Sequence, residues 1–190
     1  MEIVLATNNL HKLQEVQKIC EGLDVTFILP PQEFNPEETG STFFENSYIK
    51  AKAANDLTHK ITLADDSGLC VDALNGAPGL YSSRFAGTQQ EKIDKLLDCM
   101  KDKTDRKAKF CCAMTLLNEN GNIIFKALGE CHGEIVKEQK GVNGFGYDPI
   151  FLPENHDLTI AELSEDEKNK ISHRGNALRQ VIDFLRNIDK

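Results

Sequence analysis

The 190-residue sequence lacks any hydrophobic run long enough to cross a membrane, and its start, Met1-Glu2-Ile3, carries no basic segment. A transmembrane helix needs about 20 apolar residues, and a secretory signal needs a positively charged beginning. We therefore expect no membrane attachment. A basic excess is also missing, since 22 basic residues face 30 acidic ones and the net charge is −8. That balance disfavours binding to nucleic acid through a basic surface.

The sequence also has no Cys-x-x-Cys pair, although it contains six cysteines. Cys111 and Cys112 are adjacent within an apolar run. We interpret all six as small buried hydrophobic residues in a reducing compartment, and we expect a cytoplasmic protein. No internal repeat, low-complexity tract or Ser/Gly linker interrupts the chain. Residues 1–190 are therefore expected to form a single domain.

Hydrophobic periodicity predicts alternating strands and helices, followed by a β-hairpin. Strands are predicted at residues 3–6, 25–29, 61–64, 69–73, 110–117 and 123–127, and helices at 13–20, 42–57, 93–100 and 178–185. Residues 118–122, which include Gly121, form the predicted hairpin turn. Capping-box spacing at Thr42 and Ser164 predicts two helix N-termini. This order of elements indicates an α/β protein with a mixed sheet.

A polar turn, Thr7-Asn8-Asn9, separates the first predicted strand from the first helix, and Lys12 lies just inside that helix. Backbone N–H groups at a helix N-terminus attract anions, and asparagine tolerates the left-handed backbone of an anion-binding nest. The turn and Lys12 therefore indicate a phosphate site. The alternative is a helix cap followed by a surface lysine. The chain contains no Walker P-loop.

Two pairs of adjacent carboxylates, Glu37-Glu38 and Asp65-Asp66, offer hard oxygen ligands. Asp65-Asp66 directly follows a predicted apolar strand, and carboxylates at strand ends face the crevice where α/β sheets bind ligands. Mg²⁺ usually takes one or two carboxylates together with phosphate oxygens. These pairs indicate a Mg²⁺ site, and the alternative is a turn with two solvated acids.

Two further segments suit recognition of a flat, polar ligand. In Gly141-Val142-Asn143-Gly144-Phe145-Gly146-Tyr147-Asp148-Pro149, glycines around two aromatic residues let the backbone approach a ligand and offer a ring for stacking. A turn with buried aromatic residues has the same pattern. Ser172-His173-Arg174-Gly175 places a guanidinium beside an imidazole, which suits carbonyl or phosphate oxygens. The alternative there is a helix cap with two surface cations.

In this order, the segments resemble the inosine triphosphate pyrophosphatase family. The matching motifs, between Leu5 and Leu178, are Thr-Asn-Asn-x-x-Lys, Glu-Glu-Thr-Gly-x-Thr-Phe-x-Glu-Asn, Ala-Asp-Asp-Ser-Gly-Leu, Gly-Phe-Gly-Tyr-Asp-Pro and Ser-His-Arg-Gly. The resemblance implies a two-lobed α/β fold with a long mixed sheet and helices around a central substrate groove. It also implies a homodimer that uses Mg²⁺ to hydrolyse ITP, dITP and XTP to the monophosphate and pyrophosphate. Asn8 is a departure, because many relatives carry glycine there.

The resemblance also implies roles for single residues. The implied metal ligands are Glu37 and Asp66, and Asp66 is also the implied proton acceptor; the choice over Glu38 and Asp65 rests on the family pattern. The implied substrate contacts are Thr7, Asn8, Asn9, Lys12, Lys50, Ser67, Phe145, Gly146, Tyr147, Asp148, Lys168, His173 and Arg174. Two rival functions are a pyrophosphatase for other altered nucleotides and a catalytically silent nucleotide sensor.

Overall fold

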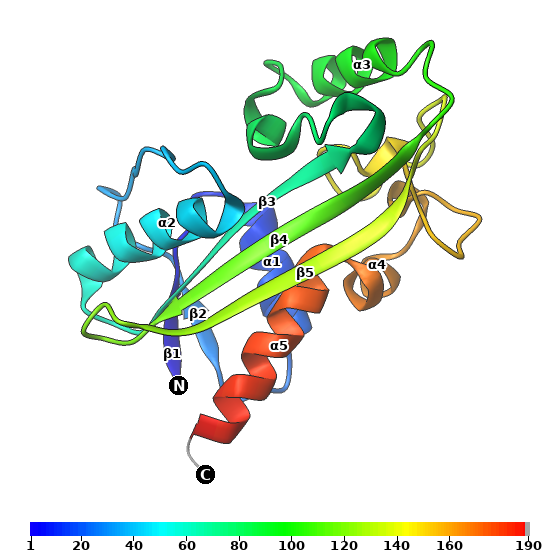
Figure 1. Ribbon diagram of the computed structural model, residues 1–190. Coiled ribbons are helices and arrows are strands. Elements are labelled where there is room, and N and C mark those ends of the chain that lie inside the picture. Colours follow the sequence, from blue (N-terminus) through cyan, green and yellow to red (C-terminus); the bar gives the residue numbers. More distant parts are fainter. Residues whose placement is uncertain (189–190) are drawn as a thin grey trace. The chain divides into compact units, whose positions relative to one another are not determined.

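The computed structural model describes residues 1–188, and in this range the chain forms a six-stranded sheet with flanking helices (Figure 1). The strands are β1 (Glu2–Leu5), β2 (Thr26–Ile28), β3 (Thr62–Val71), β4 (Lys107–Leu117), β5 (Ile123–Ile135) and β6 (Phe151–Pro153). Their hydrogen-bonded order is β2-β1-β3-β4-β5-β6. β1 is parallel to β2 and β3, whereas β5 and β6 are antiparallel. The predicted α/β class with a mixed sheet is therefore confirmed.

Side-chain caps determine where several helices begin. The α-helices of the described residues are α1 (Leu10–Ile19), α2 (Phe43–Thr58), α3 (Gln89–Cys99), α4 (Glu165–Ile171) and α5 (His173–Ile188). Short 3-10 helices occur at η1 (Asp72–Leu74), η2 (Gly79–Arg84), η3 (Asp148–Ile150) and η4 (Ile160–Glu162). The predicted capping box at Ser164 is complete, and Thr42 caps α2 by accepting the N–H of Glu45. The Glu45 carboxylate bonds to Ser41 instead of Thr42, so the second box is only half formed.

One predicted boundary is wrong. The sequence predicted two separate strands, at residues 61–64 and 69–73, but β3 is continuous from Thr62 to Val71, so the alternative of two solvated acids in a turn is also wrong. Asp65 and Asp66 are buried within the strand, where cationic side chains from other elements neutralise them. They therefore lie in the middle of β3 and point to opposite faces of the sheet. The structure also extends β5 to Ile135 and adds β6, which the sequence did not predict.

The chain divides into two compact units that are built from separate segments. Unit 1 contains Met1–Asp66, Cys112–Gly129 and the chain from Arg174 onward, and unit 2 contains Ser67–Cys111 and Glu130–His173. Three of these crossings lie within β3, β4 and β5, and the last lies between His173 and Arg174. Because the chain passes from unit to unit inside regular elements, no linker composition marks the division.

In unit 1, alternate residues of β1 pack on opposite faces of the sheet. Ile3 packs with Val16 of α1 and Leu178 of α5, whereas Val4 packs with Ala51 of α2. Figure 1 accordingly shows α2 (cyan) and α5 (red) on opposite sides of these strands. The small alanine side chains on α2 allow that helix to approach the strands closely. This packing brings the N-terminal half of β3 within reach of side chains from both helix layers.

Unit 2 has a separate hydrophobic core. Leu69 of β3 and Phe110 of β4 pack there with Ile93 and Leu96 of α3 and with Phe151 of β6. α3 therefore presents an apolar stripe with the three-residue spacing that its sequence predicted. Within residues 1–188, no helix combines the length and the apolar character that spanning a bilayer requires.

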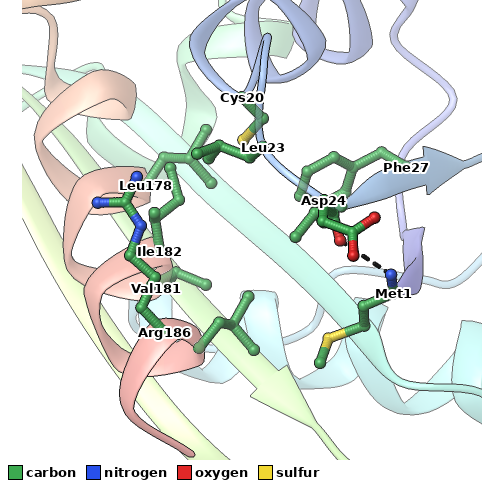
Figure 2. Close-up of a pocket in the computed structure, with 11 residues that line it drawn as sticks. Met1, Cys20, Leu23, Asp24, Phe27, Leu178, Val181, Ile182 and Arg186 are labelled. Carbon is green, nitrogen blue, oxygen red and sulfur yellow. Dashed lines mark hydrogen bonds between the residues drawn. The ribbon is translucent and has the colours of Figure 1, made fainter. Parts of the chain in front are cut away.

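Unit 1 also contains an apolar cavity of about 350 Å³, which lies between α5 and the residues that follow α1 (Figure 2). Its lining residues are Met1, Cys20, Leu23, Asp24, Val25, Phe27, Leu178, Val181, Ile182, Leu185 and Arg186. The Met1 amino group closes one side by donating to the backbone oxygen of Asp24. None of the site residues predicted from the sequence lines this cavity, so the predicted chemistry belongs elsewhere.

Candidate functional site

The predicted phosphate turn forms the N-terminal cap of α1. Thr7 Oγ1 accepts the N–H of Asn9 at 3.0 Å, and Asn9 Oδ1 accepts the N–H of His11 at 3.0 Å. Asn9 has a φ of −93°, and within residues 1–188 neither Asn8 nor Asn9 has a positive φ. Side-chain hydrogen bonds, rather than the left-handed nest that the sequence suggested, therefore shape the turn. The Asn8 amide donates to the backbone oxygen of Phe34 at 3.0 Å and holds the turn against the segment before Glu37.

A buried network of charges joins three elements of unit 1. Lys12 Nζ of α1 lies 3.0 Å from both carboxylate oxygens of Asp65 on β3. Arg174 Nη2 of α5 lies 3.1 Å from Asp65 Oδ2, and Arg174 Nη1 donates to Glu15 of α1. Burial alone would raise the pKa of Asp65, but the charges of Lys12, Arg174 and Lys50 outweigh it and hold that pKa well below its usual range. Asp65 is therefore ionised and holds Lys12 in place through an ion pair.

A second charged group lies on the other face of β3. Lys50 Nζ of α2 is 2.8 Å from Asp66 Oδ1 and 2.9 Å from Glu38 Oε1. Burial raises the pKa of Asp66, and the Lys50 charge opposes that rise without cancelling it. Burial would lower the pKa of Lys50, but Asp65, Asp66 and Glu38 together raise it, so Lys50 stays cationic. Because its pKa is raised, Asp66 accepts a proton more readily than an exposed aspartate does.

The structure distinguishes the two adjacent glutamates. Glu38 is half-buried and contacts Lys50, whereas the predicted ligand Glu37 is exposed. Their segment is fixed against α2, because the fully buried Asn46 accepts the N–H of Gly40 at 2.8 Å. A Cβ at Gly40 would lie 2.7 Å from Asn46 Oδ1, so only glycine fits there. The segment from Glu37 to Gly40 is therefore held in place beside Lys50.

One carboxylate oxygen of Asp66 is a suitable ligand for a cation. Its Oδ2 atom is buried and has no hydrogen-bond partner among the residues that the structure describes. Burying a carboxylate oxygen without a partner costs free energy unless a cation or a proton compensates its charge. Residues 1–188 contain no group of three or more acidic, histidine or cysteine side chains that could hold a metal by themselves. Mg²⁺ does not require one, because it binds through one or two carboxylates with substrate phosphates and waters. The donor set therefore fits Mg²⁺ shared with a phosphate ligand.

In unit 2, the glycine-rich segment folds around Asp148. Asp148 Oδ2 accepts the N–H of Phe145 at 2.9 Å and lies 2.8 Å from Lys168 Nζ of α4. Lys168 Nζ also lies 4.6 Å from the centroid of the Phe145 ring, a cation–π distance. Gly144 has a φ of +73°, and a Cβ there would lie 2.1 Å from Asp148 Oδ2. Glycine at this position therefore lets the buried Asp148–Lys168 pair form.

The two aromatic residues of this segment have different positions. Tyr147 belongs to the core of unit 2, and its hydroxyl donates to the backbone oxygen of Ser82 at 2.8 Å. Phe145 is half-buried, so it is the more accessible of the two aromatic residues. Gly146 donates its N–H to Gln89 Oε1 of α3 at 3.0 Å. Both patterns weighed from the sequence, a buried aromatic residue and an accessible ring, thus occur in one loop.

The Ser-His-Arg-Gly motif is divided between the two units. His173 lies in unit 2, where its buried ring stacks on Phe110 with centroids 4.8 Å apart and planes 14° apart. Arg174 lies in unit 1 and enters the network with Glu15 and Asp65. Neither side chain is exposed, so the alternative of two surface cations on a helix cap is wrong. Ser67 is half-buried on β3, directly after Asp66.

Sequence reasoning missed two members of the charge networks, Glu15 and Asp65. Glu15 is an acid beside Val16 on the buried side of α1, and it is only 6% exposed. An acid within the apolar stripe of a helix is a signal for a buried partner, because an unpaired buried charge is strongly unfavourable. Asp65 was weighed only as an alternative metal ligand, and the structure instead gives it two cationic partners.

Comparisons with known proteins agree with this arrangement. The model of the Ham1 family matches residues 3–184. A dITP/XTP pyrophosphatase from Coxiella burnetii is 50% identical over 194 residues, which cover 97% of this chain and 96% of the relative. Solved structures of Ham1 proteins from C. burnetii and Staphylococcus aureus superpose with TM-scores of 0.88 and 0.89 at 47% and 41% identity. The coverage of both chains is 98% for the first and 100% for the second. As its sequence motifs predicted, the chain belongs to the Ham1 family, among whose members are dITP/XTP pyrophosphatases.

Proposed function

We propose that this chain hydrolyses the α–β phosphoanhydride of non-standard purine nucleoside triphosphates, namely ITP, dITP and XTP. The products are the nucleoside monophosphate and pyrophosphate, so the enzyme removes deaminated purines from the nucleotide pool. One observation carries the proposal most strongly: the buried carboxylate of Asp66 lies beside Lys50 and has an uncompensated oxygen. Its relatives include dITP/XTP pyrophosphatases, and they supply the substrate class.

The implied cofactor is Mg²⁺, held by Asp66 and Glu37 together with substrate phosphate oxygens. Glu38 is the alternative second ligand, because it already shares Lys50 with Asp66. When bound, Mg²⁺ supplies positive charge that polarises phosphate oxygens and favours departure of pyrophosphate. The orphaned Asp66 Oδ2 and the fixed Glu37–Gly40 segment support this assignment.

The chain's own residues account for the remaining steps. Asp66 accepts a proton from the water that attacks the α-phosphorus, and its raised pKa suits that role at near-neutral pH. Lys12 and Lys50 bind the phosphates and share the negative charge that develops on pyrophosphate. The Asn9 and Thr7 side chains shape the cap of α1, and Thr7, Asn8 and Asn9 remain the predicted contacts of the phosphates. Ser67 binds substrate in this scheme and forms no covalent intermediate.

Base selectivity is assigned to unit 2. Lys168 and His173 are buried donors that suit the 6-oxo group of hypoxanthine or xanthine, whereas the 6-amino group of adenine presents donors of its own. Phe145 supplies a stacking surface, and Gly146, Tyr147 and Asp148 shape the pocket for the base. Each mismatched buried polar group is unfavourable by about 1–3 kcal/mol, so two contacts together reject ATP more strongly than one.

Arg174 has contacts that support a second role. Its guanidinium donates to Glu15 and Asp65, and Asp65 in turn holds Lys12. We therefore propose that Arg174 positions Lys12 for the phosphates. The purine contact that the resemblance implies for Arg174 stays a prediction. The homodimer and the cytoplasmic location, which rest on the resemblance and on cysteine usage, are also proposals.

Product analysis tests the proposed function. Purified protein with Mg²⁺ is given ITP, XTP, GTP or ATP in turn, and nucleotides and pyrophosphate are quantified, with Asp66→Asn as the inactive control. Monophosphate and pyrophosphate from ITP and XTP, with little from ATP, are expected. Release of orthophosphate and a diphosphate would contradict cleavage at the α–β bond. Binding of ITP without any release of pyrophosphate would favour the nucleotide sensor instead.

A further inference from the structure

A buried serine of η2 contacts two segments of unit 2 that carry predicted site residues. The Ser82 side chain is only 7% exposed. Its Oγ atom accepts the N–H of Leu69 on β3 at 2.9 Å and donates to the backbone oxygen of Gly79 at 2.6 Å. Its backbone oxygen accepts the hydroxyl of Tyr147 at 2.8 Å. Ser82 therefore connects β3 with the glycine-rich segment, and all of these residues belong to unit 2.

The contact with β3 lies close to Ser67. The chain turns back after β3, and the N–H of Val71 donates to the backbone oxygen of Ala77 at 3.2 Å. Every second N–H of a strand points to the same edge, so the N–H of Leu69 is the next one on this edge, and Ser82 accepts it. Ser67 lies two positions earlier in the same strand. Ser82 therefore fixes β3 beside a predicted substrate contact.

The other contact fixes residues 145–148, which we call the base loop. Tyr147 is buried, and burial raises its pKa, so its hydroxyl keeps its proton near neutral pH. A buried hydroxyl needs a hydrogen-bond partner, and the backbone oxygen of Ser82 supplies one. The next residue, Asp148, accepts the N–H of Phe145 and pairs with Lys168. A shift of Tyr147 would therefore displace the Asp148–Lys168 pair.

The base loop has a second contact with the same part of unit 2. The N–H of Gly146 donates to Gln89 Oε1 at 3.0 Å, but Gln89 is exposed at the start of α3. Water competes with an exposed hydrogen bond, whereas a buried one is electrostatically stronger. The buried contact between Tyr147 and Ser82 is therefore the stronger restraint on the loop.

We propose that Ser82 is a positioning residue for base selection, because its two contacts hold the base loop against β3 beside Ser67. The inference rests on the proposed function, which assigns recognition of the 6-oxo group to buried donors of unit 2. In this role Ser82 acts through Tyr147 and Lys168 and not on the substrate. A loosened loop displaces Lys168 from the 6-oxo oxygen of ITP. Adenine offers Lys168 no such oxygen, so ATP loses less and the preference for ITP falls.

Hydrogen–deuterium exchange of the full-length protein without nucleotide tests the contacts directly. In Ser82→Ala and in Tyr147→Phe, peptides that cover residues 145–148 should exchange about 2- to 10-fold faster, because either change disconnects the base loop from β3 by one hydrogen bond. The exposed neighbour Ser83 provides the control, and Ser83→Ala should leave this exchange unchanged. Unchanged exchange over residues 145–148 in both Ser82→Ala and Tyr147→Phe would overturn the proposal.

The ratio of the kcat/KM values for ITP and ATP tests the consequence for selectivity. Ser82→Ala should lower this ratio by about 2- to 10-fold, the range expected for one hydrogen bond, and Ser82→Thr, which retains a hydroxyl, should recover most of it. A loss of stability alone reduces the amount of folded enzyme, so it lowers both kcat/KM values in proportion and leaves their ratio unchanged. An unchanged ratio in Ser82→Ala would make Ser82 a purely structural residue and overturn the proposal.

Combining the two variants distinguishes one connected path from two independent contacts. The double variant Ser82→Ala with Tyr147→Phe should lower the ratio no further than the larger single change, because either change already breaks the connection between β3 and the base loop. Two effects that multiply in the double variant would overturn the proposal. If the unmodified protein released no pyrophosphate from ITP, the proposed function would fail, whereas the exchange measurement would still decide whether Ser82 holds the base loop.

Discussion

Arg174 Nη2 lies 3.1 Å from Asp65 Oδ2, although 109 positions separate the two residues in the sequence, and both side chains are almost entirely buried. This pair connects the start of α5 with the middle of β3, and Lys12 completes the contact from α1. Lys12, the lysine that we propose binds the phosphates, is thus held by a buried carboxylate that is itself held by a buried guanidinium.

Removing the charge of Asp65 should strongly destabilise unit 1. We predict that Asp65→Asn lowers the free energy of unfolding by about 3–5 kcal/mol, because it leaves buried cations without compensation. Urea denaturation followed by circular dichroism measures this change. The control is Lys52→Met, which removes the exposed contact with Asp56 and should change stability by less than about 1 kcal/mol. If the two variants lowered the free energy of unfolding equally, the buried network would contribute no more to stability than an exposed ion pair does.

The lowered pKa of Asp65 predicts how the stability of the protein changes at acidic pH. Its folded-state pKa lies below the ordinary value of about 3.9, because the charges of Lys12 and Arg174 outweigh the effect of burial. The contribution of Asp65 to stability is therefore fully present above about pH 4, and it is lost as the pH falls further toward the folded-state pKa. Between pH 5 and pH 3, the unmodified protein should lose stability more steeply than Asp65→Asn. Parallel losses in denaturation curves at these pH values would refute the depressed pKa.

The two adjacent glutamates should differ in their effect on Mg²⁺. We predict that Glu37→Gln raises the Mg²⁺ concentration for half-maximal activity at least about tenfold, the size of effect seen when a metal's supporting groups are lost. Glu38→Gln should instead act mainly through Lys50, by raising the KM for the triphosphate. Titration of activity with Mg²⁺ at saturating ITP measures the first effect. If Glu38→Gln instead raised the Mg²⁺ concentration for half-maximal activity and Glu37→Gln did not, Glu38 would be the metal ligand. The assignment of Glu37 from the family resemblance would then be wrong.

Two glycines of unit 2 provide a matched pair of variants. In Gly144→Ala, the new Cβ would collide with Asp148 Oδ2, whereas in Gly76→Ala, outside the named site residues, it would meet no heavy atom within 4 Å. Both residues have a positive φ, so both variants carry a similar backbone strain of about 1–2 kcal/mol. We predict that only Gly144→Ala also disrupts the Asp148–Lys168 pair and raises the KM for ITP more than tenfold, about the loss of one charged hydrogen bond. Steady-state kinetics with ITP compare the two, and an equal rise in KM would contradict a specific role for Asp148.

Substrate choice should depend on the buried donors of unit 2. His173→Ala and Lys168→Met should each reduce the preference for ITP over ATP by roughly 5- to 150-fold, since each would lose one of the proposed contacts with the 6-oxo group. The ratio of kcat/KM values for the two nucleotides reports this change independently of any general loss of activity. The Phe110→Leu variant is a useful companion, because it keeps the His173 side chain and removes the ring that stacks on it, a ring that also packs on Phe151. If the ratio were unchanged in both donor variants, base recognition would reside in other residues.

The sequence predicted local features of the fold more reliably than long-range ones. The caps at Thr42 and Ser164 form as predicted, because a cap involves only neighbouring residues. The break predicted between the strands at 61–64 and 69–73 is wrong, because Lys12, Lys50 and Arg174 neutralise the two carboxylates inside one continuous strand. These cations come from α1, α2 and α5, so no window of sequence around β3 contains the information.

The motifs brought the right residue types together but left their contacts undetermined. Asp66 and Lys50 were each assigned to the phosphate chemistry from the resemblance, and the structure places them 2.8 Å apart. Glu38 contacts Lys50 while Glu37 faces solvent, and this arrangement depends on how Asn46 holds Gly40. The spacing of residues in the sequence does not reveal that contact. Similarly, the burial of Tyr147 and the accessibility of Phe145 follow from the core of unit 2, not from the loop sequence.

The most direct test of the central claim is hydrolysis of XTP or ITP with Mg²⁺ in water enriched in oxygen-18. If water attacks the α-phosphorus with Asp66 as proton acceptor, one labelled oxygen appears in the monophosphate and none appears in pyrophosphate, and Asp66→Asn abolishes the labelling. Label in pyrophosphate would show attack at the β-phosphorus, and label in orthophosphate would show removal of the γ-phosphate. Either of these results would contradict the proposed reaction.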